Sequence, residues 1–305
     1  MENSKSIPAI IGKILLMFIF LIVLSTIVMV PLHMRATGSE LGYEQYLDQP
    51  NVETIIHILS TITMLGAVWL VYYLFDKKRG LYLGWKQKNA PKLALEGCLW
   101  GIAFMTTTFL LLWIFRIVSI SAINFEMNVI SSMGYPIILF MGVAINEEFL
   151  SRGYLHGLIK RDYGVKATVI VNSILFALLH LGNPSILQSP IPLLNLFLAG
   201  VLFAIAREVT GGLWVPIGIH FTWNLFLGNV YGFAVSGLDI GKSFIEIDIA
   251  GHHLLSGGDF GAEGSIITSM VIVLFTVGIW KWYSKRNIGE EVLEGSNVQD
   301  PKAIN

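Results

Sequence analysis

The sequence predicts an all-α integral membrane protein, a bundle of about eight transmembrane helices. Of its 305 residues, 54% are apolar and only 13% are charged, and the mean hydropathy is +0.67. Soluble domains carry about 25% charged residues, so this composition is typical of a membrane protein. The apolar residues gather in eight segments, and the cations of the connections lie mostly on one side. Lone Cys98 excludes an internal disulfide bond and a cysteine-based metal site.

Each apolar segment comes close to the roughly 20 residues that a helix needs to cross a bilayer. The predicted spans cover residues 9–32, 54–75, 93–118, 134–158, 167–182, 191–206, 213–231 and 266–283. The first is longer than the ~7–15-residue apolar region of a signal peptide and lacks a clear small-residue cleavage site, so we expect a retained anchor. The fifth and sixth are short, which fits tilted or partly re-entrant helices.

The distribution of lysine and arginine predicts the orientation of the bundle. With a cytoplasmic N-terminus and eight alternating spans, sixteen of the 20 cations are cytoplasmic, three are outside, and Arg152 lies within a span. The three outer cations are Arg35, Arg116 and Lys242. The sixteen are Lys5, Lys13, Lys77, Lys78, Arg79, Lys86, Lys88, Lys92, Lys160, Arg161, Lys166, Arg207, Lys281, Lys285, Arg286 and Lys302. A bundle with one span fewer would place the later loops on the opposite side of the membrane, and the cations would no longer concentrate on one side. We therefore expect a multi-pass cell-membrane protein with both termini in the cytoplasm.

The chain divides into four regions. Residues 1–133 hold about three spans, residues 134–231 hold four spans that contain the polar motifs, and residues 266–305 hold the last span and a polar tail. Residues 232–265 form a Gly-rich acidic outer loop, which we expect to be mobile and to gate access from outside. No cluster of Lys and Arg is interleaved with aromatic residues, so a nucleic-acid partner is excluded.

The fourth span carries three charged residues, although each costs about 2.5–3.5 kcal/mol at a helix centre. Glu148 and Arg152 are four residues apart, so they share a helix face and can neutralise each other. Glu147 is rotated by about 100° from Glu148 and lacks this partner. We therefore expect a supporting ion pair of Glu148 with Arg152 and an available carboxylate at Glu147.

Two histidines lie at nearly the depth of Glu147. The helical rise places Glu147 and His180 each ~20 Å from the cytoplasmic end of their spans, and His220 ~16 Å from the end of its own. Asn224 follows His220 by four residues, on the same face. Glu147, His180 and His220 are therefore expected at nearly the same depth in the membrane, each on a different span.

A carboxylate beside an imidazole can hold and deprotonate a water molecule, and a second histidine with an amide can stabilise an oxyanion. These residues predict peptide hydrolysis without a covalent intermediate, because no serine elbow or cysteine nucleophile accompanies them. The same Glu147, His180 and His220 could instead ligate zinc with one position open for water. We favour the metal-free version, with no required cofactor, because the sequence has no His-Glu-x-x-His helix.

Three motifs in order resemble the CPBP family of intramembrane proteases, which includes the CAAX prenyl endopeptidases and bacteriocin-processing enzymes. They are Glu147-Glu148-Phe149-Leu150-Ser151-Arg152, Phe176-Ala177-Leu178-Leu179-His180 and His220-Phe221-Thr222-Trp223-Asn224. The resemblance covers residues 134–231 and implies a helical bundle with a central cavity within the membrane. It assigns Glu147 and His180 to water activation, His220 and Asn224 to the oxyanion, and Glu148 and Arg152 to support. Family members have been described as metalloproteases and as glutamate-dependent proteases.

The leading hypothesis is an intramembrane endopeptidase whose partners are the lipid bilayer and a membrane-associated peptide or protein substrate. In the cell it could serve protein or peptide maturation, bacteriocin production or immunity, or the cleavage of a regulatory membrane protein. A second hypothesis is a proton- or cation-coupled transporter in which the Glu and His residues form a relay. A third is a catalytically silent scaffold or immunity protein. The complete motif set argues against the third, and the lack of repeat symmetry argues against the second.

Overall fold

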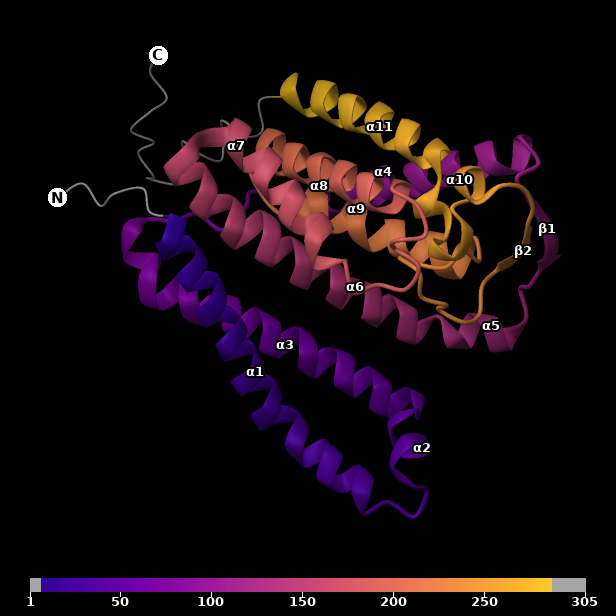
Figure 1. The fold of residues 1–305 in the computed structure, drawn as a ribbon, viewed down its shortest axis with the longest axis horizontal. Coiled ribbons are helices and arrows are strands. Elements are labelled where there is room, and N and C mark those ends of the chain that lie inside the picture. The colour runs from indigo at the N-terminus through magenta and orange to yellow at the C-terminus, as the bar shows by residue number, and fades with distance from the viewer. Residues whose placement is uncertain (1–6, 287–305) are drawn as a thin grey trace.

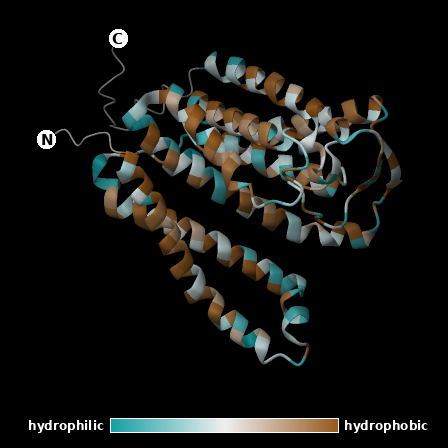
Figure 2. Ribbon diagram, in the orientation of Figure 1, coloured by the Kyte–Doolittle hydropathy of each residue, from teal (hydrophilic) through white to brown (hydrophobic). Residues whose placement is uncertain are grey.

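The computed structural model describes residues 7–286, and most of these residues are helical (Figure 1). The longer helices are α1 (Ile7–Thr37), α3 (Pro50–Phe75), α4 (Ala90–Ile114), α6 (Gly134–Glu148), α7 (His156–Leu179), α8 (Ile191–Thr210), α9 (Trp214–Leu225) and α11 (Ile266–Ser284). The shorter ones are α2 (Tyr43–Leu47), α5 (Met127–Ser132) and α10 (His253–Ser256), with the 3-10 turns η1 (Lys77–Arg79), η4 (Gly258–Phe260) and η5 (Ala262–Gly264). Apolar residues run along the helices and hydrophilic residues concentrate near their ends (Figure 2). The predicted all-α membrane bundle is confirmed; the polar tail beyond Arg286 lies outside the described residues.

Six helices in the described part of the chain are long and apolar enough to cross a membrane. This number differs from the eight predicted spans for two reasons. One continuous stretch, Met127–Leu179, contains both the fourth and the fifth span, and the chain turns between them at Gly164, whose φ of 78° and ψ of 175° are not helical. The seventh span is a helix of only 12 residues, α9, extended by a five-residue π-helix, η3 (Phe226–Val230).

The third predicted span is too long at its outer end. Helix α4 stops at Ile114, and residues Val118–Ile123 form a strand, β1, that pairs antiparallel with β2 (Ile245–Ile249). The segment reads Val-Ser-Ile-Ser-Ala-Ile, an alternation of apolar and small residues that suits a strand better than a helix. This two-stranded sheet ties the segment after α4 to the loop that precedes α11.

A hairpin of α1 and α3 stands beside the other helices (Figure 1). The buried carboxylate of Asp76, just after α3, joins this hairpin to the rest of the bundle. Lys13 Nζ lies 2.6 Å and Arg161 Nη1 lies 3.2 Å from Asp76 Oδ1, and the Tyr154 hydroxyl donates a hydrogen bond to Oδ2 at 2.9 Å. These contacts gather cations from α1 and α7 at one end of the bundle.

Helices α4 and α9 approach each other unusually closely because glycines line their contact. Gly97 and Gly101 form a Gly-x-x-x-Gly pattern on α4, and a Cβ at these positions would lie 2.4 Å from the Val215 carbonyl oxygen and 2.5 Å from that of Ile219. Small residues of this kind allow membrane helices to pack backbone against backbone. The contact fixes the position of α9, the helix that carries His220.

We expect Gly101→Ala to destabilise the protein by about 1–3 kcal/mol, because the new methyl group meets backbone atoms of α9 that cannot move alone. Gly12→Ala is the matched control, since Gly12 is helical and a Cβ at this position would have no neighbouring atom within 4 Å. There alanine should be neutral or stabilising by up to about 1 kcal/mol. Thermal unfolding in detergent measures both, and equal midpoints for the two variants would contradict this account of the contact.

The segment between β2 and α11 is packed, not loose. Phe260 and Ala262 are fully buried, and the Asn195 side chain of α8 donates hydrogen bonds to the carbonyl oxygens of Glu263 and Ser265 at 2.6 and 2.8 Å. Gly261 has φ of +86°, and a Cβ there would lie 2.0 Å from the Ala234 carbonyl oxygen. The prediction of a mobile loop is therefore wrong for residues 256–265: their glycines serve close packing.

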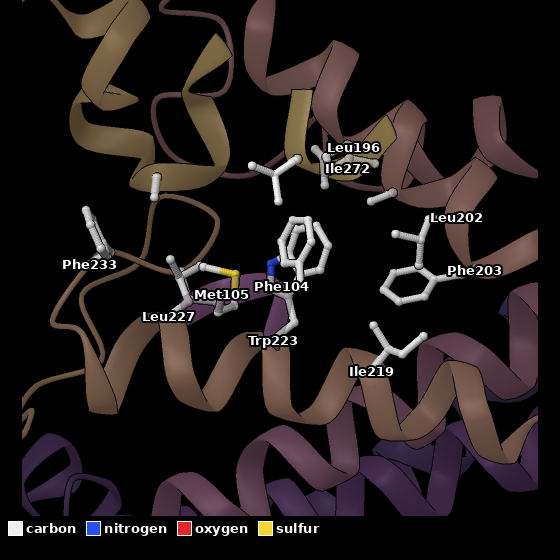
Figure 3. Packing of buried hydrophobic residues seen from close by; sticks show 14 of the residues in the cluster. Phe104, Met105, Leu196, Leu202, Phe203, Ile219, Trp223, Leu227, Phe233 and Ile272 are labelled. Atoms are coloured by element: carbon white, nitrogen blue, oxygen red, sulfur yellow. The ribbon is translucent and has the colours of Figure 1, made fainter. Parts of the chain in front are cut away.

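An aromatic core supports the helix that carries His220 and Asn224. The rings of Phe104 on α4 and Trp223 on α9 stack with centroids 4.1 Å apart, and Phe203 on α8 lies 6.1 Å from Trp223 (Figure 3). Phe203 also stacks on the His220 ring at 5.0 Å with an interplanar angle of 20°. Packing of this kind leaves these rings little freedom to rotate.

Candidate active site

Glu147, His180 and His220 converge from three helices. Glu147 lies near the end of α6, His180 follows the last residue of α7, and His220 lies within α9. Glu147 Oε2 is 3.6 Å from His180 Nε2 and 4.0 Å from His220 Nε2. The structure therefore brings together the three side chains that the sequence placed at one depth. The distances are too long for direct hydrogen bonds and leave the carboxylate facing both rings.

The far sides of both imidazole rings are already engaged. His180 Nδ1 is 2.7 Å from the carbonyl oxygen of Phe176, which can only accept, so Nδ1 carries a proton. His220 Nδ1 lies 3.0 Å from Glu148 Oε1 and donates to that carboxylate. In the neutral form each ring thus presents the lone pair of Nε2 to Glu147. Glu147 Oε2 is itself buried and has no hydrogen-bond partner among the described residues.

This arrangement is a set of three acceptors without a donor. Two Nε2 lone pairs and one carboxylate oxygen converge, and acceptors placed together in this way call for a group that brings protons or positive charge. A water molecule can donate hydrogen bonds to two of these three acceptors, which also orients its own lone pairs away from the carboxylate. The geometry is suited to holding and polarising a water molecule.

Glu148 and Arg152 form the predicted ion pair. Both side chains are completely buried; Arg152 Nη1 is 3.2 Å from Glu148 Oε1, and its Nη2 donates to the carbonyl oxygen of Gly200 on α8 at 3.3 Å. The guanidinium also lies over the rings of Phe176 and Phe203, at 4.3 and 4.9 Å from their centroids. Arg152 lies in η2 (Phe149–Leu155), a π-helix, and short π-helical segments occur frequently at functional sites. The pair connects α6 to α8 and, through Glu148, orients the His220 ring.

A cavity of about 390 Å³ contains the three converging groups. Asn224 lines it together with Glu147, His180 and His220, and within residues 7–286 its side-chain amide has no hydrogen-bond partner. Most of the remaining wall is apolar, for example Leu139, Phe140, Val143, Leu150 and Leu196. All four of the predicted catalytic residues therefore face one space.

Sequence reasoning missed a second carboxylate in this cavity, that of Glu263 in η5. Its Oε1 accepts a hydrogen bond from Trp223 Nε1 at 2.8 Å, and its Oε2 accepts from the Ser236 amide at 2.6 Å and hydroxyl at 2.9 Å. Burial raises the pKa of Glu263, and the three donors oppose that shift. The sequence indicates only an acidic outer loop at this position, and the neighbouring glycines, Gly261 and Gly264, are the one hint of close packing.

The donor set of Glu147, His180 and His220, two imidazole nitrogens and a carboxylate oxygen, is of the kind that zinc prefers. Their donor atoms are nevertheless spread out, and among residues 7–286 no group of three His, Cys, Asp or Glu side chains is gathered as a metal ion requires. The chemistry of these residues fits zinc, but their three donor atoms would have to move closer together to bind the ion.

Comparison with known proteins adds one finding. Residues 129–226 match the family model described as type II CAAX prenyl endopeptidase Rce1-like. The match spans about a third of the chain and includes all three motifs, from Glu147 to Asn224. It confirms the resemblance of this segment to the CPBP family and points to a protease. No curated protein matches the chain.

Proposed function

We propose that this chain, which resembles type II CAAX prenyl endopeptidases over residues 129–226, is an intramembrane endopeptidase. The observation that carries the proposal is a Glu147 oxygen that has no hydrogen-bond partner among the described residues and faces two imidazole nitrogens inside an apolar cavity. The experiment is cleavage of internally quenched hydrophobic peptides by the purified protein in detergent. A proton- or cation-coupled transporter would cleave none of them.

The proposed reaction needs only water and the residues of the cavity. Glu147, with His180 Nε2 as a second acceptor, holds the water and takes its proton as the oxygen attacks the peptide carbonyl carbon. The carbonyl oxygen becomes an oxyanion, to which the Asn224 amide donates, and to which His220 donates from Nε2 when its ring carries both protons. The C–N bond then breaks as the proton passes to the leaving nitrogen, which gives a carboxylic acid and an amine.

In this proposal Glu148 and Arg152 do not contact the substrate and act through neighbouring side chains. Glu148 accepts the His220 Nδ1 proton and so selects which nitrogen of that ring faces the cavity. Arg152 compensates the buried charge of Glu148. These two residues are positioning residues in our proposal, whereas Glu147, His180, His220 and Asn224 touch the reacting atoms.

Zinc is the alternative means of activating the water. Bound by Glu147, His180 and His220, it would supply a Lewis acid that lowers the pKa of a water molecule. We expect that treatment with a chelator leaves peptide cleavage largely unchanged, because the carboxylate and two rings can accept the protons of water unaided. Cleavage rates before and after chelation, together with the zinc content of the protein by elemental analysis, check this. Loss of cleavage that added zinc restores would establish the metal-dependent version.

We also propose a multi-pass arrangement in a cell membrane with both termini in the cytoplasm. Figure 1 places the start of α1 and the end of α11 at the same end of the bundle. Lys13 and Arg161 meet Asp76 at that end, as Lys160 meets Glu208 at 2.9 Å. A concentration of cations at one end of a bundle favours its cytoplasmic placement. In this arrangement residues 134–231 remain the catalytic core, preceded by residues 1–133 and followed by the outer segment 232–265 and the last helix with its tail, residues 266–305.

A further inference from the structure

Asn172 is a fully buried polar residue on α7, the helix that leads to His180. Its side-chain amide donates a hydrogen bond to the carbonyl oxygen of Ser151 in the π-helix η2. Its own oxygen, Oδ1, is also buried and has no hydrogen-bond partner among the described residues. The amide is therefore only half satisfied, and a buried polar group in this state lowers the stability of a protein.

The Ser151 carbonyl oxygen does not need the bond from Asn172. It already accepts a hydrogen bond from the backbone amide of His156, five residues later, in the pattern of a π-helix. An apolar side chain at position 172 would therefore leave this carbonyl with a partner, and it would remove the half-satisfied amide. The stability of the fold does not account for an asparagine at this position.

The hydrogen bond of Asn172 joins the two helical segments that bring Glu147 and His180 together. Glu147 lies two residues before η2, and His180 lies eight residues after Asn172, which is about two turns of helix. The bond between α7 and η2 restrains one segment from sliding or rotating against the other. Such a shift would change the separation of Glu147 Oε2 and His180 Nε2, which is 3.6 Å.

A second side chain holds the next carbonyl oxygen of η2. Arg207, near the end of α8, donates from Nε to the Arg152 carbonyl oxygen at 3.2 Å. Its guanidinium packs against the Tyr82 ring, whose centroid lies 5.3 Å away. Donors from α7 and α8 thus fix the backbone of η2 directly after Glu148. The direction of the Arg152 side chain depends on this backbone and, through Glu148, so does the orientation of the His220 ring.

We propose that Asn172 is a positioning residue for the hydrolysis, and that it aligns Glu147 with His180 by joining η2 to α7. The inference rests on the proposed function and adds to it a residue outside the three sequence motifs. Asn172 does not line the cavity, so it contacts neither the water nor the peptide and acts through the helices that it joins. Arg207 supports the same segment from α8.

Asn172→Leu should lower kcat for cleavage of a quenched hydrophobic peptide by about 10–100-fold, the effect expected when reacting groups lose their alignment. The rate is measured per amount of monodisperse full-length protein in detergent. KM should stay the same, because the residues of the cavity wall are unchanged. The thermal unfolding midpoint should be unchanged or higher, since leucine removes the half-satisfied amide. A purely structural role would give the opposite result, a lower midpoint with the kcat of the folded protein preserved.

Ser173→Ala is the matched control and should retain the full kcat. Ser173 is the next residue of α7, it is also fully buried, and its hydroxyl donates to the Val169 carbonyl oxygen within the same helix. An unchanged kcat in Asn172→Leu, a failure of this variant to fold, or an equal fall of kcat in the control would each overturn the inference. The unsubstituted protein tests the proposed function separately: if it cleaves no peptide, the proposed function itself is wrong.

Discussion

Glu147→Ala should lower kcat/KM for peptide cleavage by about 10²–10⁴-fold, the range typical of a lost general base. The reason is that no other carboxylate can take over its position. Glu148 is turned away, with its carboxylate committed to Arg152 and His220, and Glu263 is held by Trp223 and Ser236. Glu147→Gln should lose nearly as much, because the amide keeps the shape but cannot take a proton. Initial rates with quenched peptides measure both.

The same substitutions should leave the fold intact. The Glu147 side chain is 32% exposed, and its buried oxygen makes no hydrogen bond to another described residue. Removing the side chain therefore leaves no buried hydrogen-bond donor without its acceptor. Size-exclusion profiles and thermal unfolding midpoints close to those of the unsubstituted protein are the expected result. Glu126→Gln is the control for cleavage, since Glu126 is an exposed acid in the connection before α5. Cleavage by Glu147→Ala at the unsubstituted rate would remove Glu147 from the mechanism.

The convergence of Glu147, His180 and His220 could be predicted because it follows from helical geometry. A rise of 1.5 Å per residue converts a position within a span into a depth, and residues at one depth in one bundle lie near one another. The pairing of Glu148 with Arg152 is equally local, since four residues separate them along one helix face. Side-chain orientation within a helix needs no knowledge of the chain elsewhere.

Glu263 could not be predicted in the same way. It lies 40 residues after Trp223, and its place depends on the path of an irregular segment that no periodic pattern describes. Composition suggested mobility there because glycine is common in flexible loops, yet glycine also allows positive φ values and close backbone approach. Gly261 shows the second use. The strand β1 was missed for a related reason: its partner β2 lies more than 100 residues away, and pairing over such a distance leaves no local signal.

Arg152→Met should destabilise the protein by about 3–5 kcal/mol, the cost typical of removing one partner from a buried ion pair. The substitution keeps much of the side-chain volume over Phe176 and Phe203 but leaves the Glu148 carboxylate buried with only His220 beside it. The unfolding midpoint in detergent and the yield of monodisperse protein measure the effect. Arg161→Met is the matched control, because Arg161 is 30% exposed and Asp76 retains Lys13 and Tyr154.

The double variant Glu148→Gln with Arg152→Met separates a charge effect from a packing effect. If the loss in Arg152→Met comes from an uncompensated carboxylate, neutralising Glu148 should recover part of the stability, since no buried charge is then left alone. Glu148→Gln by itself should mainly impair folding, because it leaves the Arg152 guanidinium uncompensated in its place. A Glu148→Gln protein that unfolds like the unsubstituted one yet cleaves nothing would assign Glu148 to the chemistry, and the orientation of His220 would then be its principal role.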